Sequence, residues 1–361
     1  MKIVITGGAG FIGSNFVRLA LEKGHSTLVL DLLTYAGHET TLSDLEKNPN
    51  FKFVKGDVAD GKLVRRLFAS HRPDAVVHFA AETHVDRSID DPSGFVRTNV
   101  LGTFELLEAA RRYREGMDQA SQTRFRFIHV STDEVYGALG ADGFFHEEDP
   151  YSPNSPYAAT KAGADHLARS YYQTYGLPVL ITNCSNNYGP YQFPEKLIPL
   201  MTLNAREGKE LPIYGDGGQI RDWLHVEDHC EAILTVLDKG KAGSKYLIGG
   251  RCEKNNLQVL DSLLAAVEKI QPASENAALK AKGFLRYDQL KKFVKDRPGH
   301  DRRYAIDPSK IESELGWKPR RTFEEGLLQT VQWYLSNLDW CAKVQKDNYD
   351  RGRLGLIGGH A

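Results

Sequence analysis

Residues 1–13 read MKIVITGGAGFIG, a short apolar run that opens directly into glycines. Gly8, Gly10 and Gly13 satisfy the pattern G-x-G-x-x-G, and Gly7 adds a second register, G-x-x-G-x-x-G. A strand followed by such a turn and a helix start brings bare backbone and free N–H groups against a pyrophosphate. The stretch therefore predicts a dinucleotide-binding strand–turn–helix unit at the start of the chain.

The segment after the glycines indicates which dinucleotide binds. A helix is predicted over residues 11–23, Gly24 breaks it, and a second strand, Thr27–Asp31, ends in an acid. A carboxylate about 20 residues beyond the last glycine holds the hydroxyls of an adenosine ribose and repels a 2′-phosphate. We therefore expect NAD rather than NADP. A glycine-rich turn without a ligand is the alternative.

Composition excludes several other classes of protein. The chain has 361 residues, of which 41% are hydrophobic, enough for one large α/β domain and a smaller lobe. Its 46 basic and 47 acidic residues leave a net charge of −1, so neither nucleic acid nor a membrane surface is an expected partner. No membrane span or signal peptide is apparent, and the four cysteines lack C-x-x-C spacing. We predict a cytoplasmic protein.

Strand-like and helix-like stretches alternate from residue 1 to about 185, the pattern of a doubly wound parallel sheet. The predicted strands are Ile3–Thr6, Thr27–Asp31, Phe51–Val54, Ala75–Phe79, Phe125–Val130 and Pro178–Thr182. The predicted helices lie near residues 11–23, 60–71, 95–114, 157–175, 226–238, 257–269 and 323–336. We expect an α/β protein with a Rossmann-type NAD-binding domain (1–185), a smaller C-terminal α/β substrate lobe (186–340) and a tail (341–361). The limit between the NAD-binding domain and the C-terminal lobe is not sharp in the sequence. A strand or helix from the later part of the chain can therefore return to pack with the NAD-binding domain.

Tyr157 and Lys161 lie in a helix-forming stretch that Ser155-Pro156 introduces. Residues four apart share one face of a helix. A nearby ammonium stabilises a phenolate, so we expect the pKa of Tyr157 to fall toward neutrality and the tyrosine to act as a base. A surface pair is the alternative. The earlier glycine motif and a strand that ends in Ser131-Thr132 favour catalysis.

Two adjacent acids, Asp133 and Glu134, follow that strand. Two carboxylates beside a buried cofactor are unfavourable unless one is protonated and the other ionised, which gives an acid and a base side by side. Dehydration needs both, because a base removes a carbon-bound proton while an acid expels hydroxide as water. A helix cap or a solvated turn is the alternative.

The glycine motif, Thr132, Tyr157 and Lys161 together resemble the extended short-chain dehydrogenase/reductase superfamily. Longer stretches narrow the resemblance to the dTDP-glucose 4,6-dehydratase family: residues 80–89, 98–103, 182–199, 221–229 and 296–301. The similarity covers residues 1–335. Thr83 stands where the family usually has serine, which keeps a hydroxyl for the sugar. Cys252 replaces a commoner asparagine in the segment where the resemblance implies a nucleotide contact by Asn256.

The resemblance implies an internal redox cycle in which dTDP-glucose becomes dTDP-4-keto-6-deoxyglucose plus water, a step toward dTDP-rhamnose and lipopolysaccharide sugars. NAD would stay tightly bound and be recycled at each turnover. Tyr157, supported by Lys161, would take the proton of the 4-hydroxyl, and Thr132 would hydrogen-bond the C4 oxygen. Glu134 would then remove the C5 proton while Asp133 protonates the departing 6-hydroxyl.

The resemblance also implies two sets of binding residues. The cofactor set is Gly7, Gly10, Phe11, Ile12, Gly13, Asp31, Leu32, Leu33, Thr34, Asp57, Val58, Phe79, Ala80, Ala81, Thr83, Thr98, Tyr157, Lys161 and Asn187. The substrate set is Thr83, His84, Thr132, Asn186, Glu195, Lys196, Leu197, Pro212, Ile213, Tyr214, Arg221, Asn256, Asp296, Arg297 and His300. Arg221 and Arg297 suit a diphosphate because guanidinium forks match phosphate oxygens, with structural salt bridges as the alternative.

Other interpretations stay open at this point. His225 and His229 invite a zinc site, but the H-E-x-x-H pattern is absent and we expect no metal. Rival functions are another NAD-dependent nucleotide-sugar dehydratase or epimerase, and a catalytically silent NAD-binding regulator. The acid pair argues against an epimerase, and the complete catalytic set argues against a silent protein. The family is usually homodimeric through the helices near 95–114 and 157–175.

Overall fold

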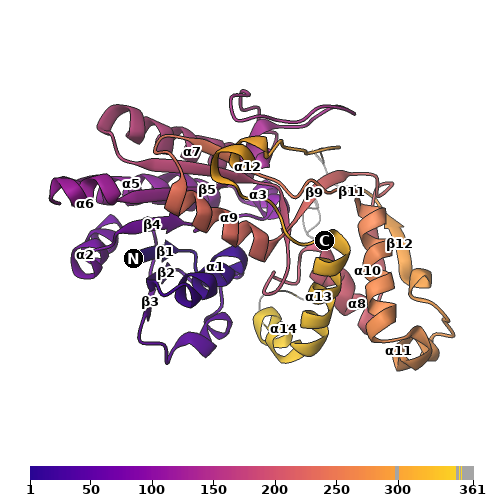
Figure 1. The fold of residues 1–361 in the computed structure, drawn as a ribbon. Helices are drawn as coiled ribbons and strands as arrows, with labels where there is room; N and C mark the ends of the chain where they lie inside the picture. The colour runs from indigo at the N-terminus through magenta and orange to yellow at the C-terminus, as the bar shows by residue number, and fades with distance from the viewer. Residues whose placement is uncertain (297–300, 347–348, 350, 352–361) are drawn as a thin grey trace.

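The computed structural model describes residues 1–296, 301–346, 349 and 351. Its centre is a seven-stranded parallel sheet in the order β10-β6-β5-β4-β1-β2-β3 (Figure 1). The strands are β1 (Lys2–Thr6), β2 (Ser26–Asp31), β3 (Phe51–Lys55), β4 (Ala75–His78), β5 (Arg126–Thr132), β6 (Val179–Cys184) and β10 (Lys245–Ile248). This order, with crossovers on both sides of β1, is the predicted Rossmann-type doubly wound sheet.

Helices cover both faces of the sheet. The apolar residues of β1 show this, because they point alternately into the two cores. Ile3 and Ile5 belong to a core with α1 (Phe11–Glu22) and α9 (Val226–Lys239). Val4 points to the opposite core, beneath α2 (Gly61–His71), α5 (Thr103–Glu115) and α7 (Pro156–Tyr175). Because successive side chains of a strand face opposite sides, a strand buried on both faces is apolar throughout.

The chain returns to the sheet after residue 186. Strand β10 pairs in parallel with β6, and α9 packs on the same core as α1. Two later elements, β10 and α9, thus return to the NAD-binding domain, as the sequence analysis allowed. The domain limits at 185 and 340 stay a prediction, while residues 226–248 lie with the large sheet. The tail predicted from residue 341 overlaps α14 (Leu338–Gln345).

A smaller lobe lies beside the sheet, on the right of Figure 1. Its core joins α8 (Leu197–Arg206), α10 (Asn256–Ile270) and α13 (Phe323–Ser336). Two small sheets flank these helices, β11-β9-β7 and β12-β8. Their strands are β7 (Asn186–Tyr188), β8 (Leu211–Tyr214), β9 (Ile220–His225), β11 (Glu253–Asn255) and β12 (Lys291–Val294).

Local sequence sets the ends of the helix that carries Tyr157 and Lys161. The Ser155 hydroxyl accepts a hydrogen bond from the Ala158 N–H, Pro156 occupies the first turn, and Gly176 ends α7 with φ of +63°. The helix predicted near 95–114 is composite, because a π-helical stretch, Val96–Gly102, joins α4 (Ser93–Phe95) to α5. The remaining short helices are α3 (Val85–Asp90), α6 (Gln119–Arg124), α11 (Ala277–Ala281) and α12 (Ser309–Leu315).

Within the described residues, no helix combines the length and apolar character needed to span a membrane.

Candidate active site

The turn after β1 leaves room for a ligand because it excludes side chains. Gly7 has φ of +71°, and a Cβ there would lie 2.5 Å from the Ala80 nitrogen. A Cβ on Gly13 would lie 2.2 Å from the Gly7 oxygen. Helix α1 therefore begins against bare backbone, with no side chain capping its first N–H groups. This geometry fits a dinucleotide pyrophosphate.

Asp31 ends β2 beside this turn and shapes it. Its carboxylate accepts hydrogen bonds from the Ala9 N–H at 2.9 Å and the Leu33 N–H at 2.8 Å. The side chain lines the cavity above the glycines. Asp31 is thus placed where a ribose diol would be held, and its negative charge opposes a 2′-phosphate.

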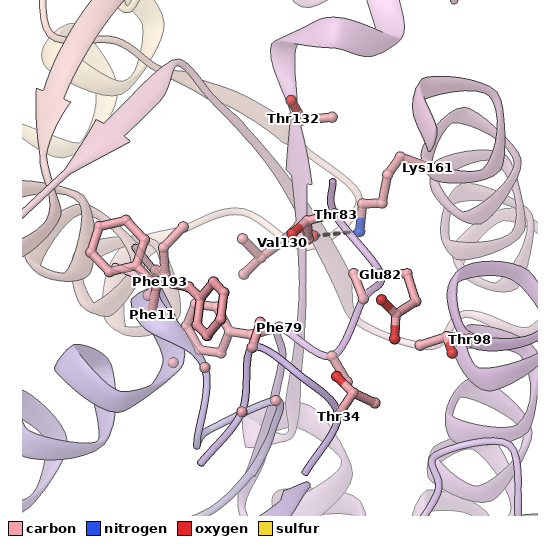
Figure 2. Close-up of a pocket in the computed structure, with 18 of the residues that line it drawn as sticks. Phe11, Thr34, Phe79, Glu82, Thr83, Thr98, Val130, Thr132, Lys161 and Phe193 are labelled. Carbon is pink, nitrogen blue, oxygen red and sulfur yellow. Dashed lines mark hydrogen bonds between the residues drawn. The ribbon is translucent and has the colours of Figure 1, made fainter. Parts of the chain in front are cut away.

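One long cavity runs from the glycine turn to α7. Phe11, Phe79 and Phe193 gather at one side of it, and Glu82 and Thr98 lie at the other (Figure 2). Every predicted cofactor residue except Leu33 lines this cavity. Leu33 instead turns the chain with φ of +58° and donates its N–H to Asp31. Of the predicted catalytic residues, all five, Thr132, Asp133, Glu134, Tyr157 and Lys161, lie at the same cavity.

The acid pair follows β5 in a 3-10 turn, Asp133–Tyr136. The Thr132 hydroxyl donates to Asp133 Oδ1 at 3.3 Å and accepts from the Glu134 N–H at 3.3 Å. Asp133 is only 2% exposed, and burial, followed by the charge of Glu134, raises its pKa well above the usual value. Burial and the neighbouring Glu134 charge therefore favour the protonated form of Asp133. Glu134 lines both this cavity and the next one.

The prediction that Lys161 lowers the pKa of Tyr157 is wrong in this structure. Burial, followed by the charge of Glu134, raises the pKa of Tyr157 well above 10. The Lys161 ammonium instead donates to the Val130 carbonyl oxygen at 2.8 Å (Figure 2). The helix does bring both side chains to the cavity, but i, i+4 spacing does not make them direct partners.

A second cavity joins the first at Glu134 and extends into the smaller lobe. It is lined by most of the predicted substrate residues, namely Thr83, His84, Asn186, Glu195, Lys196, Leu197, Pro212, Ile213, Tyr214, Arg221 and Asn256. Thr132 lies in the first cavity. Asp296 lines neither cavity and accepts a hydrogen bond from Gln219 Nε2 at 2.8 Å. Arg297 and His300 lie outside the described residues.

Glu195 lies at the wall shared by the two cavities. Its side chain is 1% exposed and accepts a hydrogen bond from the Tyr35 hydroxyl at 3.1 Å. The Arg87 guanidinium lies 3.4 Å from the same carboxylate and 3.8 Å from the centre of the Tyr35 ring. These contacts bring together a loop after β2, helix α3 and the loop before α8.

Arg221 enters the second cavity from β9. Its guanidinium donates to the carbonyl oxygens of Ile220 and Asp301, and it lies 4.3 Å from the centre of the Tyr304 ring. Its positive charge also opposes the rise in the pKa of Asp133. This arrangement leaves the guanidinium suited to a diphosphate beside the acid pair.

Sequence reasoning missed several lining residues, among them Glu82, Gln192, Phe193, Trp223 and Tyr304. The first four lie within the stretches on which the resemblance rests, so membership in those stretches could have identified them as lining residues. Tyr304 follows the last such stretch, and only the fold brings it to Arg221.

His225, the last residue of β9, and His229 of α9 have structural roles. The His225 Nδ1 accepts the Glu227 N–H at the start of the helix, and His229 Nδ1 lies 2.9 Å from Asn187 Oδ1. Burial lowers the pKa of each to about 3. In the described part of the chain, no group of three or more His, Cys, Asp or Glu side chains is arranged to hold a metal ion.

Comparison with known proteins places this site in a family. The family model described as GDP-mannose 4,6 dehydratase matches residues 4–330. A dTDP-glucose 4,6-dehydratase of Xanthomonas campestris is 54% identical over 98% of both chains. The crystal structure of a dTDP-glucose 4,6-dehydratase from Streptomyces venezuelae, with NAD and dTDP bound, superposes with a TM-score of 0.83. It is 45% identical and covers 95% of this chain and 100% of its own.

An enzyme of the same name from Bacillus anthracis, in complex with NAD, is also 45% identical, with a TM-score of 0.81 over 95% of this chain and 99% of its own. Both solved structures have the Rossmann-type fold described above. At 95% coverage of this chain, the similarity spans both the large sheet and the smaller lobe. The chain belongs to the dTDP-glucose 4,6-dehydratase family.

Proposed function

We propose that this protein converts dTDP-glucose to dTDP-4-keto-6-deoxyglucose and water. The observation that carries the proposal is the acid pair at the junction of two cavities, with Asp133 buried and its pKa raised, and Glu134 lining both spaces. One cavity has a glycine turn and ribose-binding acid suited to NAD, and the other reaches Arg221. When bound, NAD supplies the hydride acceptor for C4 and the hydride donor for C6.

Tyr157 and Thr132 act at the 4-hydroxyl of the sugar. Thr132 hydrogen-bonds the C4 oxygen, and Tyr157 removes the hydroxyl proton. Because burial holds the phenol neutral, positive charge in the loaded site must assist its ionisation. Lys161 lines the same cavity, and its ammonium would supply part of that charge once the loaded site brings it toward the phenol oxygen.

The acid pair acts next, at C5 and C6. The ketone at C4 acidifies the C5 proton, so oxidation has to precede elimination. Glu134 removes that proton, and Asp133 gives its own proton to the departing 6-hydroxyl as water forms. Each such proton-transfer group contributes about 10²- to 10⁴-fold in rate. Protonated Glu134 then returns the proton to C5, which completes a cycle with no net oxidation.

The smaller lobe holds the nucleotide. Arg221 pairs with the diphosphate, and Pro212, Ile213 and Tyr214 of β8 flank the base. Asn186, Glu195 and Lys196 contact the sugar-diphosphate path. The Asn256 amide lies 3.5 Å from Gln219 Oε1, which leaves it at the nucleotide end of the cavity.

The direct test is incubation with dTDP-glucose and no added reductant, followed by mass spectrometry. Loss of one water from the nucleotide sugar is expected. UDP-glucose and GDP-mannose serve as matched substrates that separate dTDP selectivity from general dehydratase activity. Conversion to an isomer of unchanged mass would indicate an epimerase, and no conversion of any nucleotide sugar would indicate a silent NAD-binding regulator.

We also propose a homodimer through α5 and α7. Val96, Leu101 and Phe104 are 52%, 40% and 38% exposed on this side, and they line a shallow apolar depression together with Leu167. Exposed apolar residues gathered on one face are typical of an interface. Sedimentation equilibrium should give twice the chain mass, and Leu101→Glu should give the monomer.

A cytoplasmic location and a role in deoxysugar synthesis complete the proposal. The four cysteines, at positions 184, 230, 252 and 341, are free thiols, which suits a reducing compartment. Cell fractionation would test the location.

A further inference from the structure

A buried acid that lines neither cavity lies next to the catalytic helix turn. Asp165 follows Lys161 by one turn of α7, so the two residues share a face of the helix. Its side chain is 1% exposed. A carboxylate removed from water in this way is costly unless other groups hold it.

The partners of Asp165 connect it to the strand that ends in the catalytic residues. The Tyr151 hydroxyl donates to Asp165 Oδ2 at 2.8 Å, and Asn183 Nδ2 donates to the same oxygen at 3.0 Å. Asn183 Nδ2 also donates to the Thr132 carbonyl oxygen at 3.0 Å. A single amide group thus joins Asp165 to the residue that precedes the acid pair.

The charges around Asp165 come from several elements. Burial raises its pKa, but His129, Lys161 and Ser131 outweigh this and hold the pKa below the usual value. His129 Nε2 of β5 lies 3.1 Å from Oδ1. Lys245 of β10 and Tyr136 of the 3-10 turn also face this carboxylate. Asp165 is therefore an anion at neutral pH.

Lys161, which is 3% exposed, lies one helical turn before this anion on the same face of α7. Burial lowers the pKa of Lys161, and the charge of Asp165, followed by that of Cys184, opposes the decrease. His78 of β4 and His129 also face Lys161, and burial lowers the pKa of both, so they are neutral at working pH. Burial likewise raises the pKa of the Cys184 thiol. The anion that supports the buried ammonium is Asp165.

We propose that Asp165 is a positioning residue for the reaction, whose charge keeps the Lys161 ammonium protonated and whose link through Asn183 holds the end of β5 in place. The inference rests on the proposed function, because it assigns Asp165 to the support of Lys161. Asp165 lines neither cavity, so it acts on the rate of the chemistry and not on substrate binding.

The test is the pH dependence of kcat for dTDP-glucose in the wild type, Asp165→Asn and Tyr151→Phe. Asp165→Asn removes the charge and keeps the shape of the side chain. Lys161 should then lose its proton at a pH about one to three units lower, and the alkaline limb of the kcat profile should shift to lower pH by the same amount. KM should stay unchanged. Tyr151→Phe removes one hydrogen bond to the same carboxylate but leaves its charge, so the limb should not move.

An alkaline limb in Asp165→Asn that coincides with the wild type would overturn the proposal, as would an equal shift in Tyr151→Phe. If circular dichroism shows Asp165→Asn unfolded, Asp165→Glu takes its place. This variant keeps the charge, so its limb must stay where the wild type has it. A wild type inactive on dTDP-glucose would refute the proposed function, whereas an active wild type with an unshifted Asp165→Asn refutes this inference alone.

Discussion

The Thr132 hydroxyl lies 3.3 Å from Asp133 Oδ1, so the group assigned to the C4 oxygen contacts the acid assigned to the 6-hydroxyl. The end of β5 and the short turn after it therefore supply groups for both C4 and C6 of the sugar. The geometry of this turn separates the two acids, because Asp133 is buried and Glu134 faces both cavities.

Glu134→Gln should stop elimination while oxidation at C4 continues. The amide cannot accept the C5 proton, so exchange of the C5 hydrogen with deuterated water should fall by about 10²- to 10⁴-fold. Absorbance at the NADH band should still rise when dTDP-glucose is added. Exposed Glu148→Gln serves as the control and should exchange normally. Unimpaired exchange in Glu134→Gln would remove this residue from the mechanism.

Asp133→Asn should lose activity and gain stability. The amide cannot release a proton to the 6-hydroxyl, so dehydration should fall by about 10²- to 10⁴-fold. The folded-state pKa of Asp133 is raised, so the folded protein binds more protons than the unfolded chain above the usual pKa of 3.8. The contribution of Asp133 to stability is therefore greatest below that pH and is lost as pH rises.

The stability part of this prediction is checked by thermal unfolding of Asp133→Asn and the wild type across the pH range. The advantage of the variant should be absent at acidic pH and should grow as pH rises. A variant less stable than the wild type at neutral pH would show that the carboxyl is not held protonated.

Tyr157→Phe should prevent hydride removal from C4, since no group then accepts the hydroxyl proton. The NADH band should not appear on the bound cofactor, while the melting temperature should stay close to that of the wild type because Phe keeps the ring that packs against Phe95. Normal NADH formation in Tyr157→Phe would assign the base elsewhere.

Much of this architecture was predictable from sequence for a physical reason. Five strands of the sheet, β1, β2, β4, β5 and β6, are buried over nearly their whole length, and several are nearly continuous apolar runs such as Ile3–Thr6 and Ala75–Phe79. The edge strand β3 buries mainly Phe51 and was recognisable from its apolar residues. The seventh strand, Lys245–Ile248, is short and begins with a charged residue. Its place is set by pairing with β6, which local sequence does not reveal.

The site was predictable to the extent that its residues follow strands or occupy one helix. The carboxyl ends of parallel strands meet at one edge, which brings Asp31 and Thr132 to a common cavity. Burial is a property of the whole fold, so the raised pKa of Tyr157 was not foreseen. The contact of Tyr304 with Arg221 likewise depends on tertiary packing.

Arg221→Lys should weaken nucleotide binding without removing the local charge. Lysine lacks the planar fork that matches a diphosphate, so KM for dTDP-glucose should rise roughly tenfold while kcat changes little. Exposed Arg112→Lys provides the matched control. Equal KM values for Arg221→Lys and the wild type would place the diphosphate away from β9.

The transfer of hydride within one sugar is the central claim, and deuterium at C4 of dTDP-glucose tests it most directly. We expect a product lighter by one water that carries the deuterium at C6, with no reductant added. A product that has lost the label, or that keeps it at C4, would contradict the account.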